Sequence, residues 1–467
     1  MTSRLPVLLA LALVCVGVEA QSTVTLPLHR GPEQRLADWT TLSFPEGEYQ
    51  ARREAVMRRL STTGGGVLLV PSAEGTSGGE TFRQTNDFLY FTGLEAPASV
   101  LAIDADAHRT LLFAPRRDPR FESAGRPNDF PGRPLADAPA LAQQLGIDSV
   151  APVDGFAAWL GAQVVQGRLL RVNREHAATA DVRTQPLFAR WSPGESLERA
   201  VRTMQPDARI ENAFADVARL RMVKSPREQG VLRRAVATAA AAMRESLTAA
   251  RDGADELAVQ GVFESACRRR GAHSFGFTPI IKSGPNALWP WRVLGSQSDR
   301  RHRVMRAGEI VIFDVGCEVD FYTSDIGRTF PVSARFTPSQ RALVELVRMV
   351  SDSILAQIRP GVTLGELQRV AMRVIPIEAR PYMQTGSFFG HHIGLDSGDP
   401  SLFDEPLAAG MVFTVEPWYY NHDSGLAAFI EDNVLVTAVG IEVLSRELPR
   451  TAAGLESLRG AARRRLR

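Results

Sequence analysis

Five side chains that can ligate metals lie at the ends of apolar runs, or inside them, in the second half of the chain. They are four carboxylates and one histidine: Asp314, Asp325, His391, Glu416 and Glu431. A carboxylate is costly to bury in an apolar strand unless a cation or hydrogen bonds compensate it. Four carboxylates carry roughly four negative charges at neutral pH, which two divalent cations would neutralise. The sequence therefore predicts a fold in which several strands converge on a buried metal site.

The residues around Asp314 and Asp325 predict two neighbouring antiparallel strands. Asp314 ends the apolar run Ile310-Val-Ile-Phe-Asp, and Asp325 follows eleven residues later, after a turn. Strands joined by a short turn pair with each other, so the two carboxylates can converge. The alternative interpretation of Asp314 is a helix cap or turn cap.

His391, Glu416 and Glu431 complete the candidate ligand set. His391 lies between glycines, where the backbone can approach a metal closely, while the two glutamates lie in strongly apolar strands. Taken singly, a His-His pair is more often exposed or packed, and a buried glutamate is more often paired with arginine. Together the five residues favour metal binding, and oxygen ligands with one nitrogen favour manganese, zinc or cobalt over copper.

The composition is that of a globular enzyme. The 467 residues are 44% apolar and 23% charged, which is ordinary for two or three folded domains. The net charge of +2 gives no electrostatic reason to expect nucleic acid or an anionic membrane as a partner. We therefore expect a peptide or small-molecule substrate. We also expect a homo-oligomeric assembly.

Residues 1–20 predict a secretory signal peptide. Arg4 precedes an apolar run from Val7 to Val18, and Val-Glu-Ala at residues 18–20 offers a cleavage site. The run is shorter than the roughly 20 residues that a membrane span needs, so we expect no membrane span and a secreted or periplasmic protein. Lipidation at Cys15 is an alternative that the preceding Leu-Val disfavours.

Only two cysteines follow the signal peptide, Cys267 and Cys317. Two cysteines are too few for a disulfide framework, although an oxidising compartment would permit one bond. We interpret them as two buried free thiols.

Two folded units are predicted after the signal peptide. Residues 21–220 indicate an α/β domain, because short apolar runs alternate with helical stretches, with a Pro/Gly-rich surface loop at 115–139. Residues 221–455 indicate an α+β domain whose two halves each contain two helices followed by strands. We interpret this order as a pseudo-twofold repeat with the site at its seam, followed by a basic tail at 456–467.

The motifs around the five candidate ligands resemble those of the pita-bread metallopeptidase family, most closely its aminopeptidase P and prolidase branch. The spacing from Asp314 to Asp325 and the later motifs at His391, Glu416 and Glu431 match. Residues 82–94 are similar to a segment of the aminopeptidase P N-terminal domain. The resemblance implies an aminopeptidase P-like domain followed by a pita-bread catalytic domain, and an Xaa-Pro aminopeptidase-like hydrolase that removes an N-terminal residue preceding proline.

The same resemblance implies roles for the ligands. Asp314 would hold one divalent ion, His391 and Glu416 the other, and Asp325 and Glu431 would bridge them. Manganese is the expected metal, with zinc or cobalt as alternatives. Glu416 would also be the catalytic residue that handles protons while the metals activate water.

The sequence departs from this family where histidines and an arginine usually surround the metals. The residues at these positions are Trp291, Ser387, Gly398 and Phe429. Losing one such group typically costs about a hundredfold or more in rate, so altered specificity or reduced activity is expected. We predict Trp291 and His392 as substrate-binding residues. The other candidate replacements are His422, Arg292 and Tyr382.

Two other functions remain open. The first is a catalytically weak pita-bread protein that binds a peptide or another ligand without turnover, which absence of bound metal would favour. The second is a non-peptide hydrolase or lyase on the same scaffold. Metal-dependent turnover of a metabolite, with peptides left intact, would favour that alternative.

Overall fold

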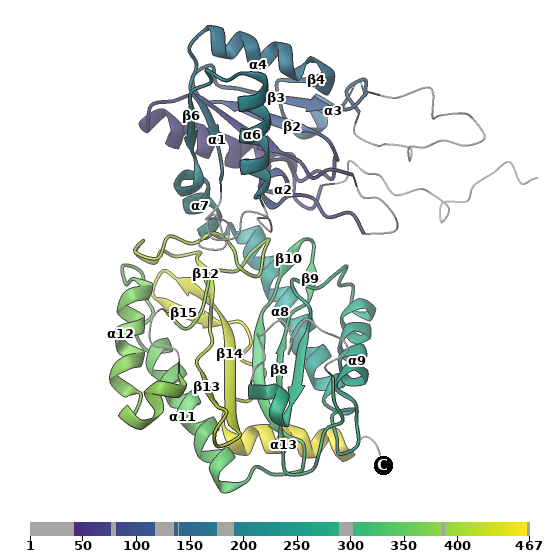
Figure 1. Cartoon of the computed structure of the whole chain (residues 1–467), viewed down its shortest axis with the longest axis vertical. Helices are drawn as coiled ribbons and strands as arrows, with labels where there is room; N and C mark the ends of the chain where they lie inside the picture. The colour runs from purple at the N-terminus through teal and green to yellow at the C-terminus, as the bar shows by residue number, and fades with distance from the viewer. Residues whose placement is uncertain are drawn as a thin grey trace, which may run out of the picture. The chain divides into compact units, whose positions relative to one another are not determined.

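Two β-sheets organise the computed structural model, one in each half of the chain (Figure 1). The structure describes residues 42–75, 81–116, 135–138, 140–174, 191–288, 302–383 and 388–464. The predicted signal peptide and most of the predicted loop at 115–139 lie outside these residues. Among the described helices, none is both long and apolar enough to cross a membrane.

The first sheet has six strands in the order β4-β3-β2-β1-β5-β6 and is mixed, because β1 runs antiparallel to β2 and parallel to β5. Its strands are β1 (Val67–Pro71), β2 (Val100–Asp104), β3 (Arg109–Ala114), β4 (Ser149–Pro152), β5 (Leu170–Val172) and β6 (Ile210–Asn212). The helices of this half are α1 (Glu46–Thr62), α2 (Asn86–Thr92), α3 (Leu141–Leu145), α4 (Phe156–Val165), α6 (Pro193–Met204) and α7 (Phe214–Met222). This arrangement confirms the predicted α/β fold of the first half.

The second sheet has seven strands and is antiparallel throughout, with β12-β14-β11-β8-β7 as its main path and β13 and β15 paired to β14. These strands are β7 (Ile280–Ser283), β8 (Ile310–Val315), β11 (Ile326–Pro331), β12 (Val412–Val415), β13 (Trp418–Asn421), β14 (Leu426–Thr437) and β15 (Gly440–Val443). A separate hairpin of β9 (Glu318–Val319) and β10 (Tyr322–Thr323) connects β8 to β11.

Two helices precede the strands in each half of this domain, as predicted. They are α8 (Pro226–Ser246) and α9 (Glu256–Arg269) in the first half, and α11 (Pro338–Leu355) and α12 (Leu364–Val374) in the second; α13 (Ala452–Arg464) follows the last strand. Figure 1 shows α11 and α12 beside β13–β15 and α8 and α9 beside β8. The halves meet where β11 pairs with β14. The pita-bread fold with its repeated halves is thus confirmed.

The helix starts follow from local sequence chemistry. Ser225 caps α8, since its hydroxyl accepts from the Glu228 N–H (3.3 Å) and the Glu228 carboxylate accepts from the Ser225 N–H (2.8 Å). Thr337 and Thr363 make the same reciprocal caps at α11 and α12. The predicted boundary between residues 220 and 221 falls in the last turn of α7.

Cys267 and Cys317 form a disulfide, with their Cα atoms 5.9 Å apart. The prediction of two free thiols was therefore wrong. Helix α9 packs against the sheet at β7, which brings Cys267 next to Cys317, two residues after the end of β8. The 50 residues between the two cysteines give no local signal of this contact.

Candidate metal centre

Two of the predicted ligands lie in one row across the middle of the second sheet. Gly327 of β11 is in register with Asp314 of β8 on one side and with Glu431 of β14 on the other. Residues opposite each other on paired strands point to the same face. The side chains of Asp314 and Glu431 therefore share one face of the sheet, with a glycine between them that adds no side chain to the space.

Asp325 reaches the same region from the turn that precedes β11. Its backbone is held by the side chain of Asn433, which donates from Nδ2 to the Asp325 carbonyl (2.6 Å) and accepts the Asp325 N–H at Oδ1 (3.1 Å). Asn433 lies on β14 two residues after Glu431, so the same strand supplies one ligand and positions another. The Asp325 side chain is buried, with 5% of its surface exposed.

His391 faces these carboxylates through its Nε2 atom. Nε2 lies 3.2 Å from Glu416 Oε1 and 3.6 Å from Asp325 Oδ2. The other ring nitrogen, Nδ1, lies 3.2 Å from the carbonyl oxygen of His392. A proton on Nδ1 donated to this carbonyl would leave Nε2 as the free ligand atom, which is the usual arrangement of metal-binding histidines.

Thr414 connects His391 to Glu416. Its hydroxyl accepts from the His391 N–H (3.0 Å) and donates to Glu416 Oε1 (3.0 Å). Gly390, before His391, has a φ of 145°, and a Cβ there would lie 2.1 Å from the Thr414 carbonyl oxygen. The glycine is therefore needed for close contact with strand β12, whereas the sequence had suggested close contact with a metal.

Among the residues that the structure describes, Asp325 and Glu431 have less positive charge beside them than their burial requires. Ligand atoms of Asp325, His391 and Glu431 lie within 4.8 Å of one another. Burial and neighbouring carboxylates raise the pKa of both Asp325 and Glu431 well above their ordinary values. Within the described part of the chain, Asp325 Oδ1 and Glu431 Oε2 are buried without a hydrogen-bond partner. Buried oxygens of this kind fit divalent cations.

The protonation of His391 follows from the same excess of negative charge. Burial lowers its pKa, but the hydrogen bond with Glu416 and the charges of Glu416 and Asp325 outweigh burial and raise the pKa to about 10. A protonated His391 cannot bind a metal, so cations would compete with this proton. Three of the five predicted ligands, Asp325, His391 and Glu431, thus form a group that could hold a metal ion. Glu416 lies beside His391, and Asp314 lies in the same row of the sheet as Glu431.

Tyr420 of β13 is a site residue that the sequence interpretation missed. Burial raises its pKa well above 10, and the charges of Asp314, Glu416 and Glu431 raise it further. Its side chain must therefore lie near these carboxylates. Alternation along β13 places Tyr420 on the same side as Trp418, but the local sequence does not show which of the neighbouring tyrosines faces the metal ligands.

Two of the positions that depart from the family pattern are described. Phe429 is completely buried, and a Cβ on Gly327 would lie 2.0 Å from its ring. The Phe429 ring therefore covers Gly327 in the row between Asp314 and Glu431. Gly398 is exposed, and a Cβ there would meet no atom within 4 Å. Trp291, Ser387 and Arg292 lie outside the described residues.

His392 is buried in the core beside Phe413 of β12. Its side chain is completely buried, its ring lies 5.8 Å from that of Phe413, and burial and the charge of Lys224 lower its pKa to about 3. The predicted role of His392 in substrate binding is not supported, because alternation in the loop turns it away from His391. His422 is exposed beside Asp423 (3.4 Å), and Tyr382 packs on Tyr419.

Known proteins share this fold and these motifs. Residues 230–438 match Metallopeptidase family M24, and residues 49–168 match the Aminopeptidase P, N-terminal domain. The chain is 28% identical over 418 residues to Xaa-Pro aminopeptidase 3 of Mus musculus, covering 81% of this chain and 77% of that protein. It is also 28% identical over 458 residues to the Xaa-Pro aminopeptidase of Escherichia coli strain K12, covering 89% and 98%.

A solved variant of Escherichia coli aminopeptidase P has the same fold. It superposes with a TM-score of 0.70 at 26% identity, covering 90% of this chain and 99% of that one. The family is one of metal-dependent enzymes, and the buried carboxylates and His391 provide the ligands that divalent ions need. Residues 230–438 therefore form a domain of the metallopeptidase family M24 type, and the protein is a metallo-aminopeptidase with an aminopeptidase P N-terminal domain.

Proposed function

We propose that this metallo-aminopeptidase removes an N-terminal residue that precedes proline, using a centre of two divalent ions. The observation that carries the proposal is the grouping of Asp325, His391 and Glu431, whose ligand atoms lie within 4.8 Å of one another. Glu416 lies 3.2 Å from His391, and Asp314 shares a row of the sheet with Glu431. Among the described residues, buried oxygens of Asp325 and Glu431 lack hydrogen bonds. Four negative charges match two divalent cations. The names of the relatives, Xaa-Pro aminopeptidases, supply the substrate class.

The residues that would hold the ions are Asp314, Asp325, His391, Glu416 and Glu431. Hard oxygen ligands with one imidazole favour manganese, with zinc or cobalt as alternatives. Bound ions would polarise the scissile carbonyl and lower the pKa of water. These roles account for the ligand types without any further cofactor.

Glu416 is suited to accept and return the proton during hydrolysis. Its Oε1 atom accepts a hydrogen bond from the Thr414 hydroxyl at 3.0 Å, and in the metal-free protein it lies 3.2 Å from His391 Nε2. Such contacts fix the orientation of the carboxylate, so the other oxygen can meet the proton of the attacking water. The Tyr420 phenol, which stays protonated beside the carboxylates, can donate a hydrogen bond to developing negative charge.

The side chains around the ligands favour an apolar substrate and a slower reaction. Phe429 replaces a charged side chain with a buried ring at Gly327, and Trp418 packs edge-on against Phe389 with ring centroids 5.1 Å apart. Gly398, where the family pattern has a histidine, has no side chain that could donate a proton. We infer reduced activity or altered specificity relative to enzymes that keep the usual histidines.

We further propose a secreted or periplasmic location and a homo-oligomeric assembly. The predicted signal peptide at residues 1–20 directs export. The Cys267–Cys317 disulfide supports this location, because disulfides persist in oxidising compartments and are rare in the cytosol.

Peptide cleavage tests the activity. The manganese-loaded mature protein should release the first residue of Xaa-Pro peptides faster than that of matched Xaa-Ala peptides, measured by mass spectrometry. Glu416→Gln should lower the rate by about a hundredfold or more, whereas Glu442→Gln, in a partly exposed ion pair with Arg233, should leave the rate unchanged. A metal-loaded wild type that releases no first residue would refute the assignment.

A further inference from the structure

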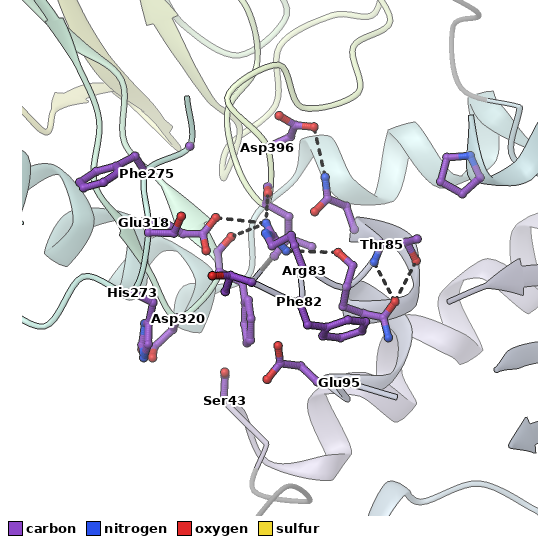
Figure 2. Close-up of a pocket in the computed structure, with 18 of the residues that line it drawn as sticks. Ser43, Phe82, Arg83, Thr85, Glu95, His273, Phe275, Glu318, Asp320 and Asp396 are labelled. Atoms are coloured by element: carbon purple, nitrogen blue, oxygen red, sulfur yellow. Dashed lines mark hydrogen bonds and ion pairs between the residues drawn. The ribbon is translucent and has the colours of Figure 1, made fainter. Parts of the chain in front are cut away.

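A cavity of about 980 Å³ lies beside the β9–β10 hairpin, separate from the five metal ligands, none of which lines it. Its walls come from the segments before and after α2, from residues 273–276, from the hairpin and from residues 395–396 (Figure 2). A volume of this size accommodates an extended side chain with part of its peptide. The cavity is therefore large enough for a ligand of its own.

Arg83 fixes the shape of the cavity. Its guanidinium donates to the Leu395 carbonyl (2.9 Å), pairs with Glu318 (3.2 Å) and lies over the Phe321 ring, 5.5 Å from the centroid. The Asn86 amide donates to Asp396 Oδ2 at 3.2 Å. Because these contacts join the segment before α2 to the hairpin and to the loop after His391, the walls are preformed.

Glu95 is the acidic group of the cavity that is left without a direct partner. Glu318 pairs with Arg83, Asp320 with Arg234 and Asp396 with Asn86. Among the described residues, the Glu95 carboxylate makes no hydrogen bond or ion pair, and Figure 2 shows it directed toward the interior of the cavity. Burial raises the pKa of Glu95, which the more distant charges of Arg83 and His273 partly oppose. A cationic ligand would stabilise the ionised carboxylate.

Aromatic rings complete the lining. Phe82, Phe275 and Phe321 lie on different wall segments, so an apolar stem that enters the cavity would be covered from several directions. Aromatic faces also attract cations. A long aliphatic stem that ends in a positive charge, as in lysine and arginine, matches both the apolar walls and Glu95.

Only a few residues separate the segments that form the cavity walls from the segments that carry the metal ligands. Glu318 lies four residues after Asp314, and Asp396 lies five residues after His391. Gly276 lies four residues before Ile280, whose register partner is Asp314. Because each residue spans at most about 3.6 Å, these wall residues lie within about 18 Å of the ligands, a distance that a few residues of an extended peptide can cover.

We propose that the cavity binds a lysine or arginine side chain of the peptide substrate, downstream of the scissile bond, with Glu95 as its charge partner. This inference rests on the proposed aminopeptidase function for the source of the ligand. Such a site makes the enzyme selective for basic peptides, a property that the metal ligands themselves do not determine.

Binding of paired peptides to the metal-free protein tests the proposal without requiring turnover. Two Xaa-Pro peptides would differ at one downstream position, arginine in one and norleucine in the other, and calorimetry would give both Kd values. The wild type should bind the arginine peptide about tenfold more tightly, as expected for a partly buried charge pair. In Glu95→Gln the ratio of the two Kd values should fall to about one.

Asp207→Asn provides the matched control, because Asp207 is exposed and does not line the cavity; its Kd ratio should equal that of the wild type. Equal binding of both peptides by the wild type, or a preference that survives in Glu95→Gln, would overturn the proposal. If the peptides bind with the expected ratio but none is cleaved after manganese is added, the proposed function fails while the basic-residue site stands.

Discussion

The side chain of Asn433 holds both polar groups of the Asp325 backbone, accepting from its N–H at 3.1 Å and donating to its carbonyl at 2.6 Å. The two residues are 108 positions apart in the chain and both are buried. This pairing connects β14 to the turn before β11, so it sets where the Asp325 carboxylate lies relative to Glu431. Positioning contacts of this kind tune metal affinity as strongly as many ligands do.

Asn433→Ala should therefore weaken metal binding by about ten- to a hundredfold, and the loss of two buried hydrogen bonds should cost roughly 1–3 kcal/mol of stability. Isothermal titration with manganese measures the first effect and urea unfolding the second. Gln340→Ala is the control, because Gln340 is a buried amide that caps α11 away from the ligands. It should lower stability alone. Wild-type metal affinity in Asn433→Ala would contradict the role of Asn433.

The ligand set should make the metal-free protein less stable as the pH rises. The raised pKa values of Asp325 and Glu431 mean that the native state keeps protons which the unfolded state releases above about pH 4. His391, whose pKa is raised to about 10 despite its burial, keeps a proton that the unfolded chain loses above about pH 6.5. Both contributions are present at low pH and are lost as the pH increases.

Thermal unfolding between pH 5 and pH 9 checks this dependence. The Tm of the metal-free wild type should fall relative to that of Glu431→Gln, which removes one of the repelling carboxylates. Saturating manganese should reverse the trend for the wild type, because metal binding displaces the protons and strengthens with pH. Parallel Tm curves for the two metal-free proteins would mean that these groups do not titrate as described.

A buried cluster anchors the loop that follows His391. Asp399 pairs with Arg221 at 2.5 Å and with Lys224 at 3.0 Å, and all three side chains are at least 97% buried. Asp399→Asn leaves two buried cations with less compensation and should cost about 3–5 kcal/mol in urea unfolding. Glu442→Gln, which breaks the more exposed pair with Arg233, should cost less than about 1 kcal/mol. Equal effects of the two substitutions would show that burial does not determine the strength of the Asp399 pairs.

The Cys267–Cys317 disulfide fixes the start of the β9–β10 hairpin to α9. Closing a loop of this length constrains the unfolded chain by about 4 kcal/mol. Cys317→Ser should lower the free energy of unfolding by this amount under oxidising conditions, and Cys267→Ser should do the same. The wild type should lose as much in the presence of a reductant that acts on the unfolded chain. If the reductant leaves the stability of the wild type unchanged, Cys267 and Cys317 are free thiols.

The sequence pointed to the four candidate carboxylate ligands because each places a charge in or beside an apolar run. Asp314 and Glu431 are charged residues in apolar strands, so they can be recognised without knowing which strands pair. Asn433 and Tyr420 could not be found in this way, since their roles depend on which strand pairs with which. The same holds for the disulfide, whose two cysteines meet only after α9 packs on the sheet.

His392 shows that a residue next to a candidate ligand in the sequence need not face the site. Adjacent residues in an extended loop point to opposite sides, so the residue next to His391 is turned into the core beside Phe413. The cavity beside the hairpin could not be predicted either. It is formed by Arg83, Glu95 and Glu318, which are separated by many residues and brought together by the fold.

Metal stoichiometry tests the central claim most directly. The mature protein, stripped of metal and then titrated with manganese, should bind two ions per chain, with elemental analysis of the dialysed complex giving the same number. Asp325→Ala should retain a cooperative thermal transition and bind fewer than one ion, because it removes a ligand from the middle of the cluster. A folded Asp325→Ala protein that still binds two ions, or a wild type that binds none, would contradict a dinuclear centre at these residues.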